Sequence, residues 1–256
     1  MRIAVLTSLY PSAVRPSEGI FAERRWSGMR ARGHEICVVH PLPWSPLPFA
    51  RREWSEIARM PRIEQRGDVR VERPRYLHVP GRARANANAF ASRGLRSILA
   101  HGKPDVVVAD YAWPASAAAP LLAATGIACV VSGRGSDVLQ VAGEAGLASE
   151  LARNLKSAGS WCAVSSDLVA RMDELGGAPG RGVLVPNGVD AALFRPRARD
   201  EARRALEIEP DARLLLVVGH LIDRKDPLLA LAAFAELPSE LQGRAQLVYI
   251  DRKSVV

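Results

Sequence analysis

A glycine followed by a short loop with basic side chains lies between two apolar segments near the carboxyl end of the sequence. The apolar run 214–218 stops at Gly219. The residues that follow include His220, Arg224 and Lys225, and they lead into a segment whose apolar residues have helical spacing. A strand that ends at a glycine and continues into a helix directs free backbone N–H groups and the positive end of the helix dipole at one place. With two cationic side chains there, the loop predicts diphosphate binding, with His220 beside the site; a merely solvated basic pair is the alternative.

Two further glycine positions follow apolar runs in the first half of the sequence. Gly19 comes after the first run, where the missing Cβ would let backbone approach a ligand closely; a simple tight turn is the alternative. Arg134 and Gly135 follow the run 128–131. An arginine stays protonated and cannot act as a general base, but it can hold a phosphate or carboxylate. We therefore expect Arg134 and Gly135 to contact substrate, and Asp137 to cap the next helix rather than to catalyse.

Several other chemistries are excluded by what the sequence lacks. The five histidines are dispersed and pair with no carboxylate at a metal-ligand spacing, and there is no Asp-x-Asp cluster, so no bound metal is indicated. The first strand ends without the glycine fingerprint of dinucleotide-binding enzymes. No cofactor is therefore expected.

Composition is that of an ordinary folded protein with a basic surface. The 256 residues are 48% apolar and 24% charged, and no apolar stretch reaches the ~18 residues that cross a bilayer, so we expect a cytoplasmic protein. The net charge of +8 favours anionic partners; nucleic acid is disfavoured because no aromatic platform lies among the basic residues. Cys37, Cys129 and Cys162 are expected to be buried, reduced thiols.

The elements that must position these residues alternate between strands and helices, which predicts parallel strands with crossover helices. Continuous apolar runs predict a sheet covered on both faces. The predicted strands are 2–7, 35–40, 69–73, 105–109, 127–132, 160–164, 182–185, 213–218 and 246–250, and the predicted helices are 19–31, 87–100, 115–124, 147–157, 167–175, 200–206 and 227–237.

The chain divides into one large and one small part. The sequence predicts a complete domain over residues 1–190 and a proline-containing linker and helix over 191–210. Residues 211–250 are predicted to be the start of a second domain. Some forty residues are too few for a doubly wound sheet. Residues 251–256 match the translation of a common sequencing adapter, so we expect a non-native tail after a reading frame interrupted near Ile250; a natural polar tail is the alternative.

Six blocks in this order resemble the retaining glycosyltransferases of family four: residues 17–21, 32–39, 133–137, 163–167 and 185–190, and the loop from Gly219 to Lys225. The resemblance implies an α/β, GT-B-like fold, with a complete N-terminal Rossmann-like, doubly wound parallel sheet and the beginning of a second Rossmann-like domain. It implies a nucleoside-diphosphate sugar donor and a glycan or lipid-linked acceptor of the cell-envelope polysaccharide kind, held by the first domain. Arg224 and Lys225 would neutralise the leaving diphosphate, and Gly219 would let backbone approach it.

Two departures from the family pattern bear on activity. The related enzymes usually have a histidine where Arg134 stands. They also carry a spaced pair of glutamates further into the second domain than this sequence reaches, so we expect the chain to be a fragment with little activity. A non-catalytic module that binds a nucleotide sugar or an anionic surface is the alternative; a sugar-nucleotide epimerase would need an acidic and histidine set that is absent. The basic helix 21–32 adds an expected peripheral contact with anionic lipid at the inner face of the plasma membrane.

Overall fold

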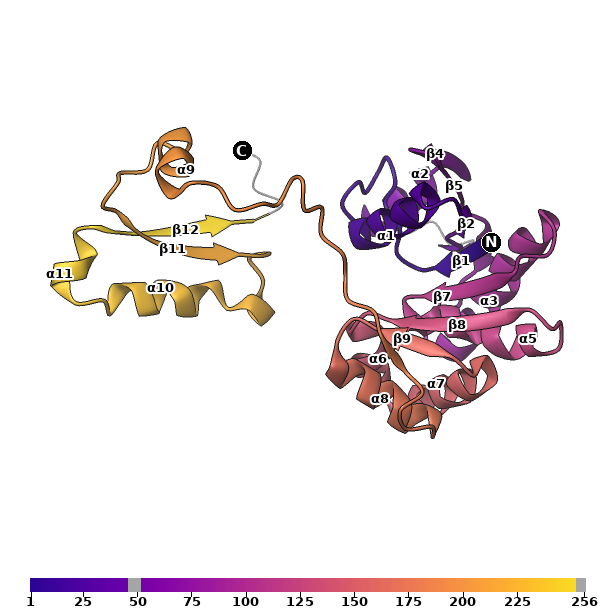
Figure 1. The fold of residues 1–256 in the computed structure, drawn as a ribbon. Coiled ribbons are helices and arrows are strands. Elements are labelled where there is room, and N and C mark those ends of the chain that lie inside the picture. Colours follow the sequence, from indigo (N-terminus) through magenta and orange to yellow (C-terminus); the bar gives the residue numbers. More distant parts are fainter. Residues whose placement is uncertain (46–51, 252–256) are drawn as a thin grey trace. The chain divides into compact units, whose positions relative to one another are not determined.

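The computed structural model describes residues 1–45 and 52–251. The chain forms two compact units, Met1–Gly188 (unit 1) and Val189–Val256 (unit 2) (Figure 1). The adapter-like tail, apart from Asp251, lies outside the described residues.

Unit 1 is built on an eight-stranded sheet in the order β10-β9-β8-β7-β1-β2-β5-β4. The strands are β1 (Arg2–Thr7), β2 (Glu35–Val39), β4 (Ile63–Arg66), β5 (Val69–Glu72), β7 (Val106–Asp110), β8 (Ala128–Gly133), β9 (Trp161–Ala163) and β10 (Val183–Leu184), while β3 (Leu42–Trp44) and β6 (Arg75–Leu77) form a separate parallel pair. The chain runs outward from β1 on one side and returns to β7 to run outward on the other. This is a doubly wound sheet with its switch point between β1 and β7.

The predicted α/β architecture with a mostly parallel sheet is confirmed, with one correction. Strand β4 pairs antiparallel with β5, so the expectation of parallel strands throughout is wrong at this edge. The reason is local: only Gly67 and Asp68 separate the two strands, and so short a connection makes a hairpin, whereas a parallel crossover needs a dozen or more residues.

Helices cover both faces of this sheet. They are α1 (Ile20–Ala31), α2 (Arg52–Arg59), α3 (Ala83–Ala100), α4 (Ala112–Ala115), η1 (a 3-10 turn, Ser116–Ala118), α5 (Ala119–Ala123), α6 (Ser136–Ala142), α7 (Ala145–Ala158) and α8 (Ser166–Gly176). Alternate residues of β1 face the two sides: Ala4 and Leu6 join the cluster under α3, and Ile3 and Val5 join the cluster under α1 (Figure 1). The continuous apolar strands are therefore buried on both faces, as predicted.

Unit 2 contains β11 (Arg213–Val218) and β12 (Ala245–Ile250), which pair in parallel, with α9 (Arg199–Ala205), η2 (Asp223–Lys225), α10 (Pro227–Ala235) and α11 (Ser239–Gln242). Helix α10 is apolar around its circumference, yet none of its residues is buried. Leu228 is 72% exposed, and Val218 on β11 is 65% exposed. A continuous apolar strand and an apolar helix thus present wide apolar surface within this unit.

The three cysteines are free thiols, but the prediction that all are buried is wrong for two of them. Cys129 is buried, whereas Cys37 and Cys162 are partly exposed. Burial is the first cause that raises the pKa of each thiol, to about 12 for Cys129 and about 11 for Cys37. All three therefore remain protonated and weakly nucleophilic at neutral pH.

Candidate functional site

A buried ion pair joins two strands at the carboxyl edge of the unit 1 sheet. Asp110 closes β7, and Arg134 directly follows β8. The guanidinium donates from Nε to Asp110 Oδ1 and from Nη2 to Asp110 Oδ2, both at 2.9 Å, and the two side chains are only 4% and 1% exposed. Trp26 Nε1 donates a further hydrogen bond of 2.8 Å to Oδ2. The charge of Arg134 is therefore matched inside the protein.

The remaining donors of Arg134 also have protein partners. Nη1 donates to Asn187 Oδ1 at 2.7 Å, and the guanidinium lies 4.9 Å from the centre of the Phe21 ring. Asp110 thus provides the carboxylate that we had expected from a substrate. Substrate contact by Arg134 stays a prediction. Asp110 was not predicted, because its only notable feature in the sequence is its place at the end of an apolar run.

A second arginine extends the same network. Arg25, on α1, donates from Nη1 to Ser132 Oγ at 3.4 Å and from Nη2 to the Val185 carbonyl at 3.1 Å. Burial, followed by the nearby charge of Arg134, lowers the pKa of Arg25. Arg25 is therefore not a free member of the basic surface predicted for helix 21–32, because its charged end is bound within unit 1.

Asp137 fastens the loop before α6. Its carboxylate accepts hydrogen bonds from the backbone N–H groups of Ala112, Arg134 (2.9 Å) and Gly135 (2.7 Å). The prediction that Asp137 caps α6 is wrong in position: it lies in the first turn, and Gly135 precedes the helix without any side-chain cap. Burial raises the pKa of Asp137, while these hydrogen bonds oppose the rise.

The two predicted glycines of unit 1 are required for different reasons. Gly19 has φ +71°, and a Cβ there would lie 2.8 Å from the carbonyl carbon of Leu9. The close approach is thus to the chain's own backbone, which supports the tight-turn alternative. Gly135 has φ +137° with open space around it, so only its backbone conformation demands glycine. Ligand contact by either residue stays a prediction.

A cavity of about 260 Å³ opens beside the Gly19 loop at the same sheet edge. Its lining residues come from the segments after β1, β2 and β7 and from α2, α3, β3 and β6: Ser8, Arg15, Glu18, His40, Pro41, Leu42, Pro43, Ile57, Met60, Tyr76, Phe90 and Pro114. The sequence analysis did not predict this cavity or a place for His40 in its lining. Ligands of doubly wound sheets bind outside the carboxyl ends of the strands, where this cavity lies.

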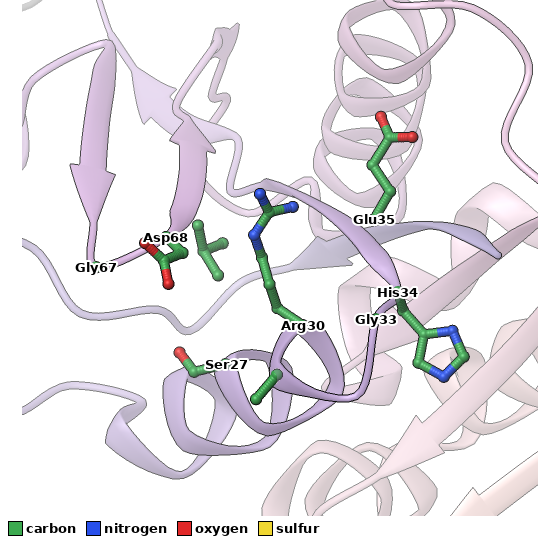
Figure 2. Close-up of a pocket in the computed structure, with 9 residues that line it drawn as sticks. Ser27, Arg30, Gly33, His34, Glu35, Gly67 and Asp68 are labelled. Atoms are coloured by element: carbon green, nitrogen blue, oxygen red, sulfur yellow. The ribbon is translucent and has the colours of Figure 1, made fainter.

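A larger, open pocket of about 600 Å³ lies at the opposite edge of the sheet. It is formed where α1 ends, β2 begins and the β4–β5 turn projects (Figure 2). Figure 2 shows the Arg30 side chain extending from the helix between Asp68 and the start of β2. None of the predicted site residues lines this pocket.

In unit 2, β11 has the predicted bounds and stops before Gly219. The Gly219 N–H donates to the Ile250 carbonyl at 3.0 Å, and a Cβ at this glycine would lie 3.7 Å from the Lys225 side chain. Lys225 is exposed and belongs to η2 with Arg224, whose side chain lies outside the described part of the structure. The backbone of this loop therefore passes beside at least one cationic side chain.

The helix that follows this loop has fewer free donors than predicted. Pro227 at its first position has no N–H, and the Asp226 carboxylate accepts the N–H of Leu229 at 3.1 Å. The expectation of several free backbone donors is therefore corrected, because the Asp226 side chain caps this helix. His220 Nδ1 lies 3.0 Å from Asp251 Oδ1. The cationic groups of the loop are Arg224 and Lys225, and Asp223 and Asp226 directly flank them.

Within residues 1–45 and 52–251, no three His, Cys, Asp or Glu side chains gather as a metal-binding group. Across the part of the chain that the structure describes, no helix combines the length and the apolar character needed to cross a membrane.

Comparisons with known proteins give a consistent assignment. The model of glycosyltransferase family 4 matches residues 26–193, which is more than half of the chain. TuaC of Bacillus subtilis, named as a teichuronic acid biosynthesis glycosyltransferase, is 27% identical over 98% of this chain and 65% of its own length. A D-inositol 3-phosphate glycosyltransferase of Actinosynnema mirum is 40% identical over 73 residues, which are 28% of this chain and 18% of that protein.

Two solved structures share the fold. WaaG, a glycosyltransferase involved in lipopolysaccharide biosynthesis, has a TM-score of 0.52 at 17% identity and covers 98% of this chain. Anabaena HepE in complex with UDP-glucose has a TM-score of 0.57 at 15% identity, also over 98% of this chain. This chain spans 64% of the WaaG chain and 60% of the HepE chain. The GT-B-like fold class predicted from the sequence is confirmed.

Proposed function

Because the chain belongs to glycosyltransferase family 4, we propose that the protein transfers a sugar from a nucleoside-diphosphate sugar to a glycan or lipid-linked acceptor with retention of anomeric configuration. The family match over residues 26–193 is the observation that carries this proposal. The HepE structure contains UDP-glucose, which supports a donor of this kind. Since this chain spans 65% of TuaC, the activity is proposed for the protein as a whole, and for the chain alone we keep the expectation of little activity.

In the proposed reaction the donor diphosphate binds at the loop that follows β11. Lys225 and Arg224 neutralise the charge that grows on the leaving diphosphate, which is electrostatic stabilisation of the transition state. Gly219 lets the backbone approach the phosphates, and His220 lies beside them. The departing phosphate oxygen takes the proton of the acceptor hydroxyl, by resemblance to the family. Because the departing phosphate takes this proton, the enzyme needs no separate general base.

We assign the acceptor to unit 1, near Gly19, Arg134 and Gly135. TuaC and WaaG are named for teichuronic acid and lipopolysaccharide biosynthesis, which supports an acceptor of the cell-envelope polysaccharide class. We place the reaction in the cytoplasm, with a peripheral contact at the inner face of the plasma membrane. Arg24 and Arg30 on α1 are exposed and supply positive charge for that contact.

The mechanism is tested by release of nucleoside diphosphate from a panel of UDP- and GDP-sugars, measured on the full-length gene product. Replacing Arg224 or Lys225 by alanine should lower the rate by roughly 10²–10³-fold, the effect of losing one preorganised charge-stabilising group. Arg195→Ala is the matched control, because Arg195 is exposed in the same unit but outside the loop. Unchanged rates in both loop variants would remove them from the mechanism.

The membrane contact is tested separately by co-sedimentation with vesicles. The protein should sediment with vesicles containing phosphatidylglycerol and stay in solution with purely zwitterionic vesicles, with binding that weakens as salt rises. Equal binding to both compositions would count against this part of the proposal.

A non-catalytic binding module is the second candidate. One observation favours it: Arg134 replaces the histidine that the related enzymes usually carry, and Asp110 holds it in a buried ion pair. Tight binding of a UDP- or GDP-sugar without release of the diphosphate, in the presence of acceptor glycans, would select this candidate.

A further inference from the structure

The long segment between β1 and α1 has few hydrogen bonds of its own. Residues 8–19 contain neither helix nor strand. Inside this segment, Ser12 and Arg15 close one turn: the Ser12 N–H donates to the Arg15 carbonyl at 3.1 Å, and the Arg15 N–H donates to Ser12 Oγ at 3.0 Å. Holding so long a segment in one conformation costs conformational entropy, so contacts from other parts of the chain must stabilise it.

The edge hairpin β4–β5 supplies two of these contacts. Glu64, on β4, accepts a hydrogen bond at Oε1 from the Ala13 backbone N–H at 3.1 Å. Arg73, which directly follows β5, donates from Nη2 to the Pro11 carbonyl at 2.6 Å. The hairpin thus holds one acceptor and one donor of the loop backbone, two residues apart.

The two side chains that hold the loop also stabilise each other. Arg73 Nη1 lies 2.8 Å from Glu64 Oε2, and the Arg73 side chain is completely buried. The contact is an ion pair rather than an aligned hydrogen bond, because neither atom has a hydrogen-bond partner among the residues that the structure describes. Burial lowers the pKa of Arg73, and the charge of Glu64 opposes the fall. The arginine stays protonated, so its buried charge requires the carboxylate.

A second contact joins the same hairpin to helix α1 (Figure 1). Arg66, at the end of β4, donates from Nε to Glu23 Oε1 at 2.6 Å and from Nη1 to Glu64 Oε1 at 3.3 Å. Two arginines and two glutamates therefore meet here with balanced charge. Glu23 lies on α1, beyond the irregular segment, so its contact holds the helix and not the loop. The two attachments can thus be broken separately.

Arg73 and Glu64 do not form a ligand site themselves. The Arg73 side chain has no exposed surface, and both carboxylate oxygens of Glu64 are occupied by the loop and the two arginines. Any influence on a reaction must therefore pass through the loop that they hold. That loop carries Arg15 and Glu18 into the lining of the 260 Å³ cavity and ends at Gly19.

We propose that Glu64 and Arg73 are positioning residues, which fix the backbone of the β1–α1 segment at Ala13 and Pro11 and thereby fix where this segment meets the acceptor. The influence on catalysis rests on the proposed function, whereas the attachment of the loop does not. A loop released from the hairpin would sample several conformations. A misplacement of about 1 Å can lower a rate by about 10²-fold.

The attachment is tested by hydrogen exchange of the Ala13 amide, followed by NMR on the 256-residue chain. Glu64→Gln keeps the size of the side chain but removes its charge. Exchange at Ala13 should become about 5- to 10-fold faster, because a hydrogen bond to a charged acceptor is replaced by a weaker one. Glu23→Gln is the matched control: it weakens the contact between the hairpin and α1 and should leave exchange at Ala13 unchanged.

The positioning role is tested by steady-state kinetics of the full-length gene product. Ala13→Pro removes the N–H that Glu64 accepts and leaves the ion pair with Arg73 in place, so it serves if Glu64→Gln does not fold. Ala13→Ser is its control, because serine keeps the N–H. We expect kcat to fall about 10- to 100-fold in Ala13→Pro and in Glu64→Gln, with the KM for the donor unchanged. The two changes combined should slow the reaction no more than the more severe one alone, because both remove the same hydrogen bond.

Three results would overturn the inference: unchanged exchange at Ala13 in Glu64→Gln, unchanged kcat in Ala13→Pro, or additive losses of rate in the combined variant. Transfer activity that survives both changes would reject the positioning role and leave the transferase in place. A full-length protein without transfer activity would reject the proposed function, and the positioning role with it. Glu64 and Arg73 would then be a structural attachment only.

Discussion

Among single residues, Arg134 donates two hydrogen bonds to Asp110, and both side chains are almost completely buried. Removing one partner of a buried ion pair leaves the other charge uncompensated, which costs more than the pair itself contributes. The stability of the structure around this pair therefore depends on both side chains.

Asp110→Asn should lower the free energy of unfolding of unit 1 by about 3–5 kcal/mol. Urea unfolding followed by tryptophan fluorescence measures it, since all five tryptophans lie in unit 1. Arg171→Gln is the control: its ion pair with Glu174 has side chains 41% and 66% exposed and should contribute less than about 1 kcal/mol. Equal, small losses in both variants would show that Arg134 is stabilised by other means.

The buried neutral His40 predicts a pH dependence of stability. Its pKa falls to about 3 on folding, from roughly 6.5 in the unfolded chain. Between these values the unfolded state binds more protons, so stability decreases as the pH falls through 6.5. The stability of the unmodified protein relative to His40→Phe should therefore decrease from pH 7 to pH 5, by up to about 1.4 kcal/mol per pH unit. If the free energies of unfolding of the two proteins changed equally between pH 7 and pH 5, this prediction would be contradicted.

The sequence made the residue types at the site visible but not their partners. Arg134 and Gly135 stand out because they follow an apolar run, and both lie at the sheet edge where such runs end. Asp110 and Asn187 are far from Arg134 in sequence, and only the order β8-β7 brings Asp110 to it. His40 gave no indication of a cavity, because nothing local shows which elements will pack around a lone histidine.

At the scale of elements, the loop between β1 and α1 crosses over its own backbone at Gly19. A Cβ at Gly19 would meet the carbonyl group of Leu9 at 2.8 Å, and backbone cannot move aside as a flexible side chain can. The glycine thus sets the course of the segment that carries Arg15 and Glu18 to the cavity.

Gly19→Ala should destabilise unit 1 clearly more than Gly81→Ala. The two glycines have nearly the same φ, +71° and +72°, but a Cβ at Gly81 would meet nothing within 4 Å. Gly81→Ala therefore isolates the cost of the left-handed conformation, about 1–2 kcal/mol. Urea unfolding of both variants measures the difference. Equal losses of unfolding free energy would mean that the Leu9 backbone moves away from the added Cβ without a measurable energetic cost.

Long apolar runs were predicted well, and short polar elements were not. All nine predicted strands exist, with ends that differ by at most one residue, because most of them are apolar runs between turn residues. Strands β3, β4 and β6 and helices α2, α6 and α11 were missed: each is short or largely polar, so tertiary pairing decides it. The predicted helix 115–124 corresponds to η1 and α5, and α4, which was not predicted, precedes it and ends at Ala115.

At the scale of the whole molecule, unit 2 presents the apolar surface that its sequence would bury. Leu228 and Leu231 on α10 are 72% and 51% exposed, and the three leucines of β11 are also exposed. Exposed apolar surface of this extent favours association between molecules, as do the unpaired edges of a two-stranded sheet. The sequence predicted the strand and the helix correctly, and it indicated that some forty residues are too few to form a doubly wound sheet around them.

The 256-residue chain should therefore self-associate as its concentration rises. Replacing Leu228 and Leu231 together by lysine should reduce this association, which light scattering and sedimentation velocity measure. Leu139→Lys is the control, since Leu139 is comparably exposed, at 57%, but belongs to α6 of unit 1. A monomeric chain at all concentrations, or an equal effect of the control, would show that the surface of α10 is not responsible.

The last residues of unit 1 are secured by two arginines, Arg25 at the Val185 carbonyl and Arg134 at the Asn187 side chain. Gly188 is thus the first residue after the two that these arginines hold by hydrogen bonds. A spectroscopic label attached at or before position 187 reports on the first unit, whereas one attached from position 189 onward reports on the second. The guanidinium that neutralises Asp110 therefore also holds the end of the first unit, through Asn187.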